Sequence, residues 1–309
     1  MSNCHKDFLR FNKAISLSSE EKKKLKTSRD AVAKRIKKYF RAKGYRNPQF
    51  KGQGSFSMNT IIRPTAGRYD LDLGIYLPGL TGNPKDWPKT ESVHKLIVKA
   101  VEGHTSIKPV SKNSCVRLIY KSPYLDIEDL SYHIDLPIYA TKTTENGSAK
   151  TVIGFKGDKQ WSEYSSPVKF KEWFLEQCRK NPRDVTQLKR IVKYLKAWKD
   201  NQPKNPKLPD GMTLTVLAAK NFQPDKRDDI ALIKTVDEFR YLLSWLFRVK
   251  KPTEPFNNLS EKMTSKQKRN FLNATRLLIE EGEKAISSKS RKNSLLIWRS
   301  LMGKRFPLE

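Results

Sequence analysis

The feature that most constrains this chain is an alternating segment at residues 68–78, RYDLDLGIYLP. Its odd-numbered positions from 71 to 77 are all apolar, whereas Asp70 and Asp72 occupy even-numbered positions. Successive side chains of a β-strand point to opposite faces, so the pattern predicts a strand with one buried face. The two aspartates then project together from the other face, with Cα atoms about 6.6–6.8 Å apart.

A second segment, YHIDLPIYA at residues 132–140, repeats the pattern with a single acid, Asp135. A strand here buries its isoleucines and leucine and offers a third carboxylate. Carboxylate oxygens without Cys or His suit Mg²⁺ or Mn²⁺, and three of them suit the two-ion arrangement used in phosphoryl transfer. Asp70, Asp72 and Asp135 are therefore the predicted catalytic and metal-binding residues.

The alternative is that the acidic pair is ordinary surface charge. A chain with 32 acidic residues among 309 contains about three acid-x-acid triplets by chance. The metal-site interpretation is favoured because the pair lies on the polar face of an otherwise apolar strand in a strongly basic chain.

A glycine-containing segment, KGQGSFS at residues 51–57, precedes the acidic pair. Glycine lets backbone approach a ligand closely, successive N–H groups of such a turn can bind phosphate, and Ser55 could add a hydroxyl donor. No Lys-Ser/Thr follows at the spacing of a Walker A loop. The alternative is a simple turn.

The net charge of +30, from 62 Lys and Arg against 32 Asp and Glu, predicts contact with polyanions. Thirteen of the basic residues lie between Lys22 and Lys51, most of them on a predicted helix that begins with a Ser18/Glu21 capping box and extends up to Gly44. Its exposed cations Lys34, Arg35, Lys37 and Lys38 are the predicted nucleic-acid-binding residues. The alternative is a solvated amphipathic helix that serves solubility.

The sequence disfavours a membrane protein, a secreted protein and a protein stabilised by disulfides or zinc. No window approaches the about 18 apolar residues of a membrane helix, and the first residues lack the apolar core of a signal peptide. The scattered Cys4, Cys115 and Cys178 favour reduced thiols over a disulfide framework or zinc site. We expect a soluble cytoplasmic protein without a membrane partner.

The periodicity of the chain changes along its length. Strands are expected at Gly67–Leu77, Val116–Tyr120 and His133–Tyr139, with a helix at Glu91–Val101. Helices are then expected at Val168–Cys178, Val185–Lys199, Thr213–Asn221, Asp229–Val249, Thr264–Glu283 and Ser290–Met302. This order predicts an α+β core with the long basic helix over residues 1–160, a helical lobe over 161–309, and a cleft between them.

Several short sequence motifs occur together in a recognisable order. They are GQGSF, DLDLGIYLP, YHIDLPIYA, GDKQW followed by SPVKFKEWF, YLKAWKD and MTLTVLAA. Together they resemble the bacterial cGAS/DncV-like nucleotidyltransferases (CD-NTases) of CBASS anti-phage systems, within the DNA polymerase β-like superfamily. The resemblance covers about two thirds of the chain, from Ser18 to Asn221. The remainder matches only in being helical.

The resemblance implies a polymerase β-like core with a mixed β-sheet, packed against a helical C-terminal lobe. It implies ribonucleoside triphosphates and two Mg²⁺ (or Mn²⁺) ions in a central cleft. Asp70 and Asp72 would hold both ions, and Asp135 would hold the ion that activates the attacking ribose hydroxyl.

The resemblance also implies the nucleotide-binding residues, which are Gly54, Ser55, Arg117, Lys196, Thr213 and Thr215. Gly54, Ser55 and Lys196 would bind the donor triphosphate, and Arg117 would contact the acceptor base. The two threonines match positions where such enzymes place a donor-pocket serine. Without the resemblance, Lys196 would be a solvated helix residue and Arg117 would pair with a nearby acid.

The expected function is template-independent joining of two or three nucleoside triphosphates into a cyclic second messenger, with release of pyrophosphate. The product would activate an effector encoded elsewhere, and regulatory RNA or another nucleic acid could modulate synthesis. Two alternatives remain at this point: a transferase that adds nucleotides linearly to RNA or a small acceptor, and a non-catalytic RNA-binding module.

Overall fold

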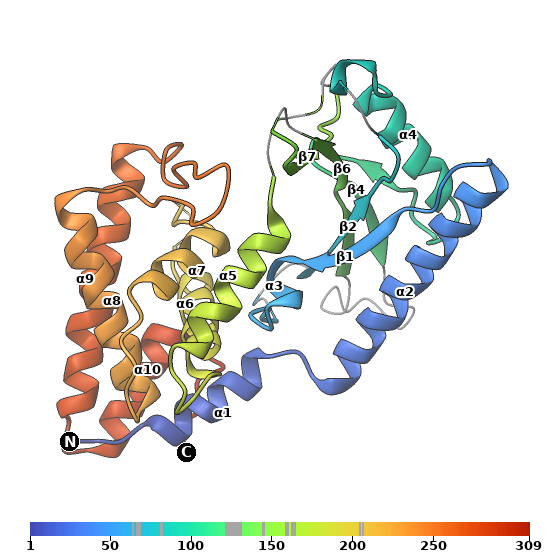
Figure 1. The fold of residues 1–309 in the computed structure, drawn as a ribbon. Coiled ribbons are helices and arrows are strands. Elements are labelled where there is room, and N and C mark those ends of the chain that lie inside the picture. Colours follow the sequence, from blue (N-terminus) through green and yellow to red (C-terminus); the bar gives the residue numbers. More distant parts are fainter. Residues whose placement is uncertain are drawn as a thin grey trace. The chain divides into compact units, whose positions relative to one another are not determined.

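The chain forms two compact units (Figure 1). The computed structural model describes residues 1–309 except 64, 66–68, 81–82, 121–131, 144–145, 158–160, 162–164, 204 and 206. The sheet unit comprises Ser18–Asn59 and Ala66–Lys171, and the helical unit comprises Met1–Leu17, Thr60–Thr65 and Glu172–Glu309. This division differs from a single boundary at residue 160, because the first 17 residues and a short internal segment belong with the helices.

The sheet unit is built on a mixed seven-stranded sheet with β2 at its centre. The strands are β1 (Gln49–Gln53), β2 (Tyr69–Tyr76), β3 (Val110–Ser111), β4 (Val116–Tyr120), β5 (Tyr132–Leu136), β6 (Ile138–Thr143) and β7 (Ala149–Ile153). Their order is β3-β4-β5-β2-β6-β7, and β1 also pairs with β2. β2 runs parallel to β5 and β6 and antiparallel to β1.

The predicted strands are found, with one correction. Residues 133–139 were expected to form one strand, but β5 ends at Leu136 and β6 begins at Ile138. Pro137 separates them because it has no backbone N–H to donate to a neighbouring strand. Of the strand expected at residues 67–77, residues 67 and 68 lie outside the described part of the chain.

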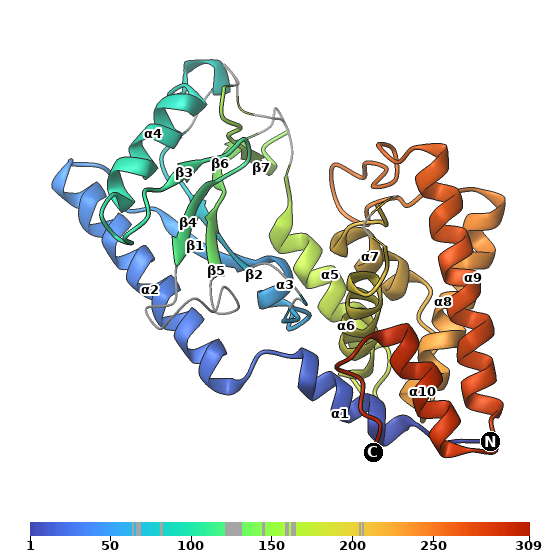
Figure 2. The ribbon, with the colours of Figure 1, turned by 180° about the vertical axis from the view of Figure 1, so that it is seen from behind.

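Two long helices accompany the sheet, together with shorter elements. They are α2 (Ser19–Ala42) and α4 (Thr90–Val101), with α3 (Gly54–Ser57) and the 3₁₀ turn η1 (Pro84–Asp86). The capping box predicted for α2 is present, since Ser18 Oγ accepts from the Glu21 N–H and the Glu21 carboxylate accepts from the Ser18 N–H. The helix buries Val32, Ile36 and Phe40 and contacts α4, and Figure 2 shows both helices beside the sheet from behind.

The helical unit contains α1 (His5–Ile15), α6 (Gln187–Asp200), α7 (Gly211–Lys220), α8 (Asp228–Trp245), α9 (Ser265–Ser287) and α10 (Arg291–Met302). The helix α5 (Pro167–Arg179) crosses the boundary between the two units. Each helix predicted after residue 167 is present. α8 ends at Trp245 rather than Val249, because the chain turns extended at Leu246 and the Val249 N–H donates to Ser260 Oγ at 3.2 Å.

Helix α1 was not predicted, although Phe8, Phe11 and Ile15 are fully buried in the helical unit. The Phe8 ring lies 5.0 Å from the Tyr194 ring and 4.8 Å from the Trp298 ring, with edge-to-face geometry at both contacts. Such aromatic pairs add stabilisation beyond the area they bury. The N-terminal segment is therefore part of this core.

These observations confirm the predicted fold class, α+β with a helical C-terminal region. Cys4, Cys115 and Cys178 are free and buried. Among the helices that the structure describes, none is long and apolar enough to cross a membrane.

Candidate active site

Asp70 and Asp72 share one face of β2, as the alternation predicted. The strand buries Leu71 and Leu73 to 1% and 2% exposure, whereas the Asp70 side chain is 45% exposed and Asp72 is half-buried. The buried leucines fix which face of the strand is inside, so both carboxylates stay on the open face.

Asp135 lies beside Asp72 on the neighbouring strand. In the parallel pairing of β2 with β5, Asp72 is the partner of Asp135 and Asp70 is the partner of His133. Paired residues of adjacent strands carry their side chains on the same face, with strands about 4.7–4.9 Å apart. The structure thus brings the three predicted carboxylates together on two adjacent strands of the sheet unit.

Arg117 binds two of these carboxylates. It lies on β4 directly opposite Asp135 in an antiparallel pairing. Its Nε donates to Asp135 Oδ1 and its Nη2 to Asp135 Oδ2, both at 2.6 Å, and the same Nη2 lies 3.4 Å from Asp70 Oδ1. The hydrogen bond to Asp135 raises the pKa of the Arg117 guanidinium. The alternative weighed from the sequence, an ion pair with a nearby acid, is what this structure contains.

His133 is a site residue that the sequence did not single out. Its Nδ1 lies 2.9 Å from Asp70 Oδ1, and its side chain is 12% exposed. His133 precedes Asp135 by two residues and therefore projects from the same face of β5. The alternating pattern that identified Asp135 could therefore also have identified His133 as a site residue.

Gly54 lies directly against the Asp72 carboxylate. It begins α3 with a φ of +67°, and a Cβ at this position would lie 1.9 Å from Asp72 Oδ2. Only glycine fits both the positive φ and the contact. Ser55 follows at the start of α3, so the predicted Gly-Ser turn lies against Asp72.

The donor set fits a divalent cation in kind, because hard carboxylate oxygens are the ligands that Mg²⁺ and Mn²⁺ prefer. Because Gly54 has no side chain, this position does not itself cover the Asp72 carboxylate. Within the described residues, however, no group of three or more His, Cys, Asp or Glu side chains is arranged to hold a metal. The Arg117 ion pairs join the carboxylates instead.

Lys196 lies on α6 of the helical unit. Its Nζ donates to the Thr60 carbonyl at 2.9 Å and lies 3.4 Å from Thr60 Oγ1. Desolvation, with smaller contributions from Lys193 and Lys199, lowers the pKa of Lys196 to about 8. This lysine is therefore not the solvated surface residue of the alternative interpretation.

Thr213 and Thr215 lie on α7, also in the helical unit, and are 2% and 1% exposed. The Thr213 N–H donates to the N-cap Asp210 at 2.7 Å, and the Thr215 hydroxyl donates to the Gly211 carbonyl at 2.6 Å. Both contacts lie within the helix, so the donor-pocket role of these threonines remains a prediction.

The four cations predicted for nucleic-acid binding are all exposed on α2. Two of them have contacts within the sheet unit: Arg35 donates to the Glu102 carbonyl, and Lys37 Nζ lies 5.7 Å from the centroid of the Phe50 ring. Lys34 and Lys38 are one helical turn apart on the same face. These two are the better probes of the basic surface.

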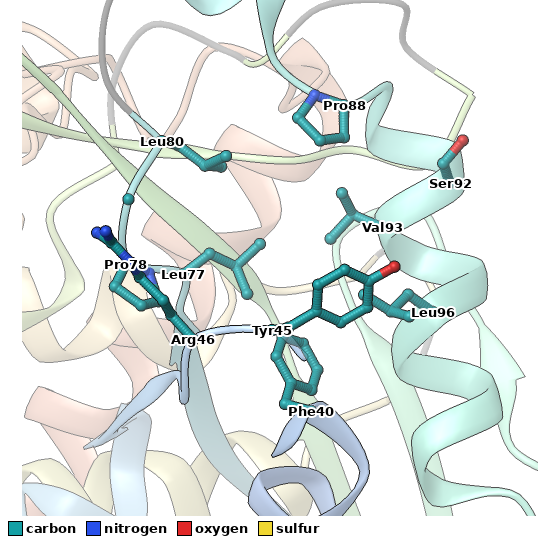
Figure 3. Close-up of a pocket in the computed structure, with 11 residues that line it drawn as sticks. Phe40, Tyr45, Arg46, Leu77, Pro78, Leu80, Pro88, Ser92, Val93 and Leu96 are labelled. Atoms are coloured by element: carbon teal, nitrogen blue, oxygen red, sulfur yellow. The ribbon is translucent and has the colours of Figure 1, made fainter. Parts of the chain in front are cut away.

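A cavity of about 330 Å³ also opens in the sheet unit, between the end of α2, the end of β2 and α4 (Figure 3). Its walls are mainly apolar, with Phe40, Leu77 and Val93 among them, and Arg46 is the only charged residue among the described residues that line it. A triphosphate carries several negative charges, so this cavity does not suit it. The carboxylates at the start of β2 remain the candidate site.

The segment that carries the three carboxylates is similar to a nucleotidyltransferase domain. Residues 48–139 match the family model described as "Cyclic GMP-AMP synthase DncV-like, nucleotidyltransferase domain". This segment contains Gly54, Asp70, Asp72, Arg117 and Asp135. It belongs to the DncV-like nucleotidyltransferase domain family, which confirms the predicted recognition and enzyme class.

Individual relatives agree with this assignment. A cyclic GMP-AMP synthase of Escherichia albertii is 28% identical over 193 residues, which are 59% of this chain and 39% of that protein. The chain thus matches about two fifths of that relative's length. Vibrio cholerae DncV bound to the linear intermediate 5′ pppA(3′,5′)pG superimposes with a TM-score of 0.76 at 21% identity, covering 99% of this chain and 97% of that one.

A second Vibrio cholerae DncV structure, described as a mutant in complex with ATP, GTP and 5MTHFGLU2, gives a TM-score of 0.77 at 19% identity. It covers 98% of this chain and 97% of that one. At these identities the structural likeness shows the fold.

The close approach of Gly54 to Asp72 can be tested with a matched pair of variants. Gly54→Ala should lower both stability and nucleotide affinity, because its Cβ collides with the Asp72 carboxylate. Gly44→Ala is the control, since Gly44 has a φ of +73° but open space around its Cβ position. Both variants should lose roughly 1 kcal/mol or more of unfolding free energy through backbone strain. Equal nucleotide affinities, measured by titration calorimetry, would show that the contact has no role in the site.

Proposed function

We propose that this chain is a metal-dependent, template-independent nucleotidyltransferase that condenses ribonucleoside triphosphates into a cyclic di- or trinucleotide and releases pyrophosphate. The observation that carries the proposal is the pairing of Asp72 with Asp135, with Asp70 on the same strand face. All three residues lie within the segment that matches the DncV-like domain.

The relatives support a cyclic product made in two steps. One is named a cyclic GMP-AMP synthase, and another was captured with a linear dinucleotide that retains its triphosphate. ATP and GTP, which are bound in a further relative, are the proposed substrates. A first transfer would join two nucleotides and a second would close the ring.

Two Mg²⁺ or Mn²⁺ ions held by Asp70, Asp72 and Asp135 would neutralise charge on the reacting phosphate and lower the pKa of the attacking ribose hydroxyl. The protein itself would contribute by binding and orienting the triphosphate. Gly54 would let the triphosphate approach the backbone, Ser55 would donate a hydroxyl, and Lys196 would contribute positive charge. The basic surface would concentrate anionic substrates near the protein.

The biological setting follows from the family resemblance. The product would act as a second messenger in a CBASS anti-phage system, in the cytoplasm, where it would activate an effector encoded elsewhere. The exposed cations of α2 would bind regulatory RNA or another nucleic acid and modulate synthesis.

The catalytic assignment is tested by replacing both β2 acids. Asp70→Asn with Asp72→Asn should lower pyrophosphate release about a thousandfold or more, because the transferring phosphoryl group loses its charge stabilisation. The fold should be retained, because the contacts that Asp70 loses with Arg117 and His133 lie on the partly exposed face of β2 and are offset in part by the loss of carboxylate repulsion. Asp30→Asn with Asp86→Asn, two exposed acids of the same unit, is the control.

Mass spectrometry of products from the four ribonucleotides decides between the alternatives. A nuclease-resistant cyclic product supports the proposal, whereas tails on added RNA would indicate a linear transferase. RNA affinity without turnover in the unmodified protein would indicate a binding module. Full activity in the folded Asp70/Asp72 double variant would refute the carboxylate assignment.

The role of Lys196 predicts a specific pH dependence. Because its pKa is lowered to about 8, the ammonium loses its charge as the pH rises through this value. The kcat/KM for triphosphate, which reports the free enzyme, should therefore fall above pH 8. Lys196→Arg should remove this fall, since arginine stays charged, whereas Lys189→Arg on the same helix should keep it. Identical profiles for all three proteins would exclude Lys196 from triphosphate binding.

The nucleic-acid surface is tested through salt dependence. Each phosphate neutralised by the protein contributes about 0.7–0.9 to the slope of log affinity against log salt. Lys34→Glu with Lys38→Glu should lower that slope by about 1.4–1.8 if each lysine contacts one phosphate. Lys85→Glu with Lys108→Glu makes the same change in charge elsewhere on the sheet unit. An equal loss in both double variants would argue against a defined surface on α2.

A further inference from the structure

The guanidinium of Arg117 links the two strands that carry the candidate ligands. It makes two 2.6 Å hydrogen bonds to the oxygens of Asp135, and a single nitrogen, Nη2, contacts both Asp135 and Asp70. A cation shared by these carboxylates would need the oxygens that this nitrogen contacts. Arg117 and a divalent cation are therefore alternative partners of the same carboxylates.

The ion pair is well shielded from water. The Arg117 and Asp135 side chains are 17% and 12% exposed, and the pairing is bidentate in a β4–β5 register that places the residues directly opposite. Bidentate arginine–carboxylate pairs are among the stronger hydrogen-bonded ion pairs, and burial reduces screening by salt. This contact differs from an exposed pair that contributes little.

The charges of the site also need a counter-ion. Three carboxylates on adjacent strands repel one another, and a cation among them relieves that repulsion. Arg117 supplies one positive charge, and His133 Nδ1 supplies a further contact to Asp70 Oδ1 at 2.9 Å.

We propose that Arg117 is a positioning residue that competes with the divalent cation for Asp135 and Asp70, and that it thereby lowers the metal affinity of the site. The proposal rests on the proposed metal-dependent function. When a cation binds, the guanidinium must leave both carboxylates, and its five N–H donors become available to a nucleotide. Metal binding and the nucleotide contact expected of Arg117 are then linked through one side chain.

The test measures metal binding rather than activity. Free Mn²⁺ is titrated by electron paramagnetic resonance with the full-length protein, Arg117→Gln and Arg29→Gln. Arg29 pairs with Asp30 on α2, so its variant removes an arginine and an ion pair outside the site. Arg117→Gln should bind Mn²⁺ about tenfold or more tightly, because a cation close to the metal is removed. Arg29→Gln should match the unmodified protein.

The direction of the effect separates competition from structural support. If Arg117 merely held the strands in place, its loss would weaken Mn²⁺ binding, and that result would overturn the proposal. Equal affinities of the unmodified protein and Arg117→Gln would also overturn it while leaving the metal site intact. Absence of Mn²⁺ binding in every protein would overturn the proposal and the proposed metal dependence together.

Two further measurements test whether the effect acts through displacement of Arg117 from Asp135. Adding Asp135→Asn to Arg117→Gln should abolish the gain in affinity, since the gain is expected to act through Asp135. In the unmodified protein, the Arg117 Nε–H signal in ¹⁵N nuclear magnetic resonance should shift as Mg²⁺ saturates the site. This measurement does not depend on the folding of any variant, and an unmoved signal at saturation would refute displacement of Arg117.

Discussion

The hydrogen-bonded register between β2 and β5 is the constraint on which the candidate site depends. It pairs Asp72 with Asp135 and Asp70 with His133, so residues more than 60 positions apart share one face of the sheet. A shift by one residue would turn the carboxylates inward and the leucines outward. The buried face of β2 therefore stabilises the site although it contributes no chemistry to it.

The antiparallel register of β4 with β5 sets the electrostatics of that site. It places Arg117 opposite Asp135, where the guanidinium offsets part of the negative charge that the folding of β2 and β5 brings together. Without a cation, three carboxylates so close would oppose the strand pairing that creates them. A cation built into the fold and one that binds for the reaction then compete for the same oxygens.

What the sequence could predict was local. Period-two alternation identified the open face of β2 and the position of Asp135, because strand geometry dictates both. The Arg117 ion pair was weighed only as one alternative, and the contact of Gly54 with Asp72 was not foreseen, since both depend on strand pairing between distant segments. His133 had a local signal, whereas the boundary between the units depends on contacts of α1 with α6 and α10, which are distant from it in the sequence.

The two cations proposed to bind nucleotide, Arg117 of the sheet unit and Lys196 of the helical unit, are held in opposite ways. Arg117 is neutralised by carboxylates, whereas Lys196 is bound by the neutral carbonyl of Thr60 and, within the described chain, forms no ion pair. Desolvation without a counter-ion lowers the pKa of Lys196, and an arriving polyphosphate would raise it again by supplying the missing charge. Lys196 is therefore suited to bind an anion directly, while Arg117 can do so only after its carboxylates have found another cation. This difference predicts an order in which metal binding precedes the contact of Arg117 with nucleotide.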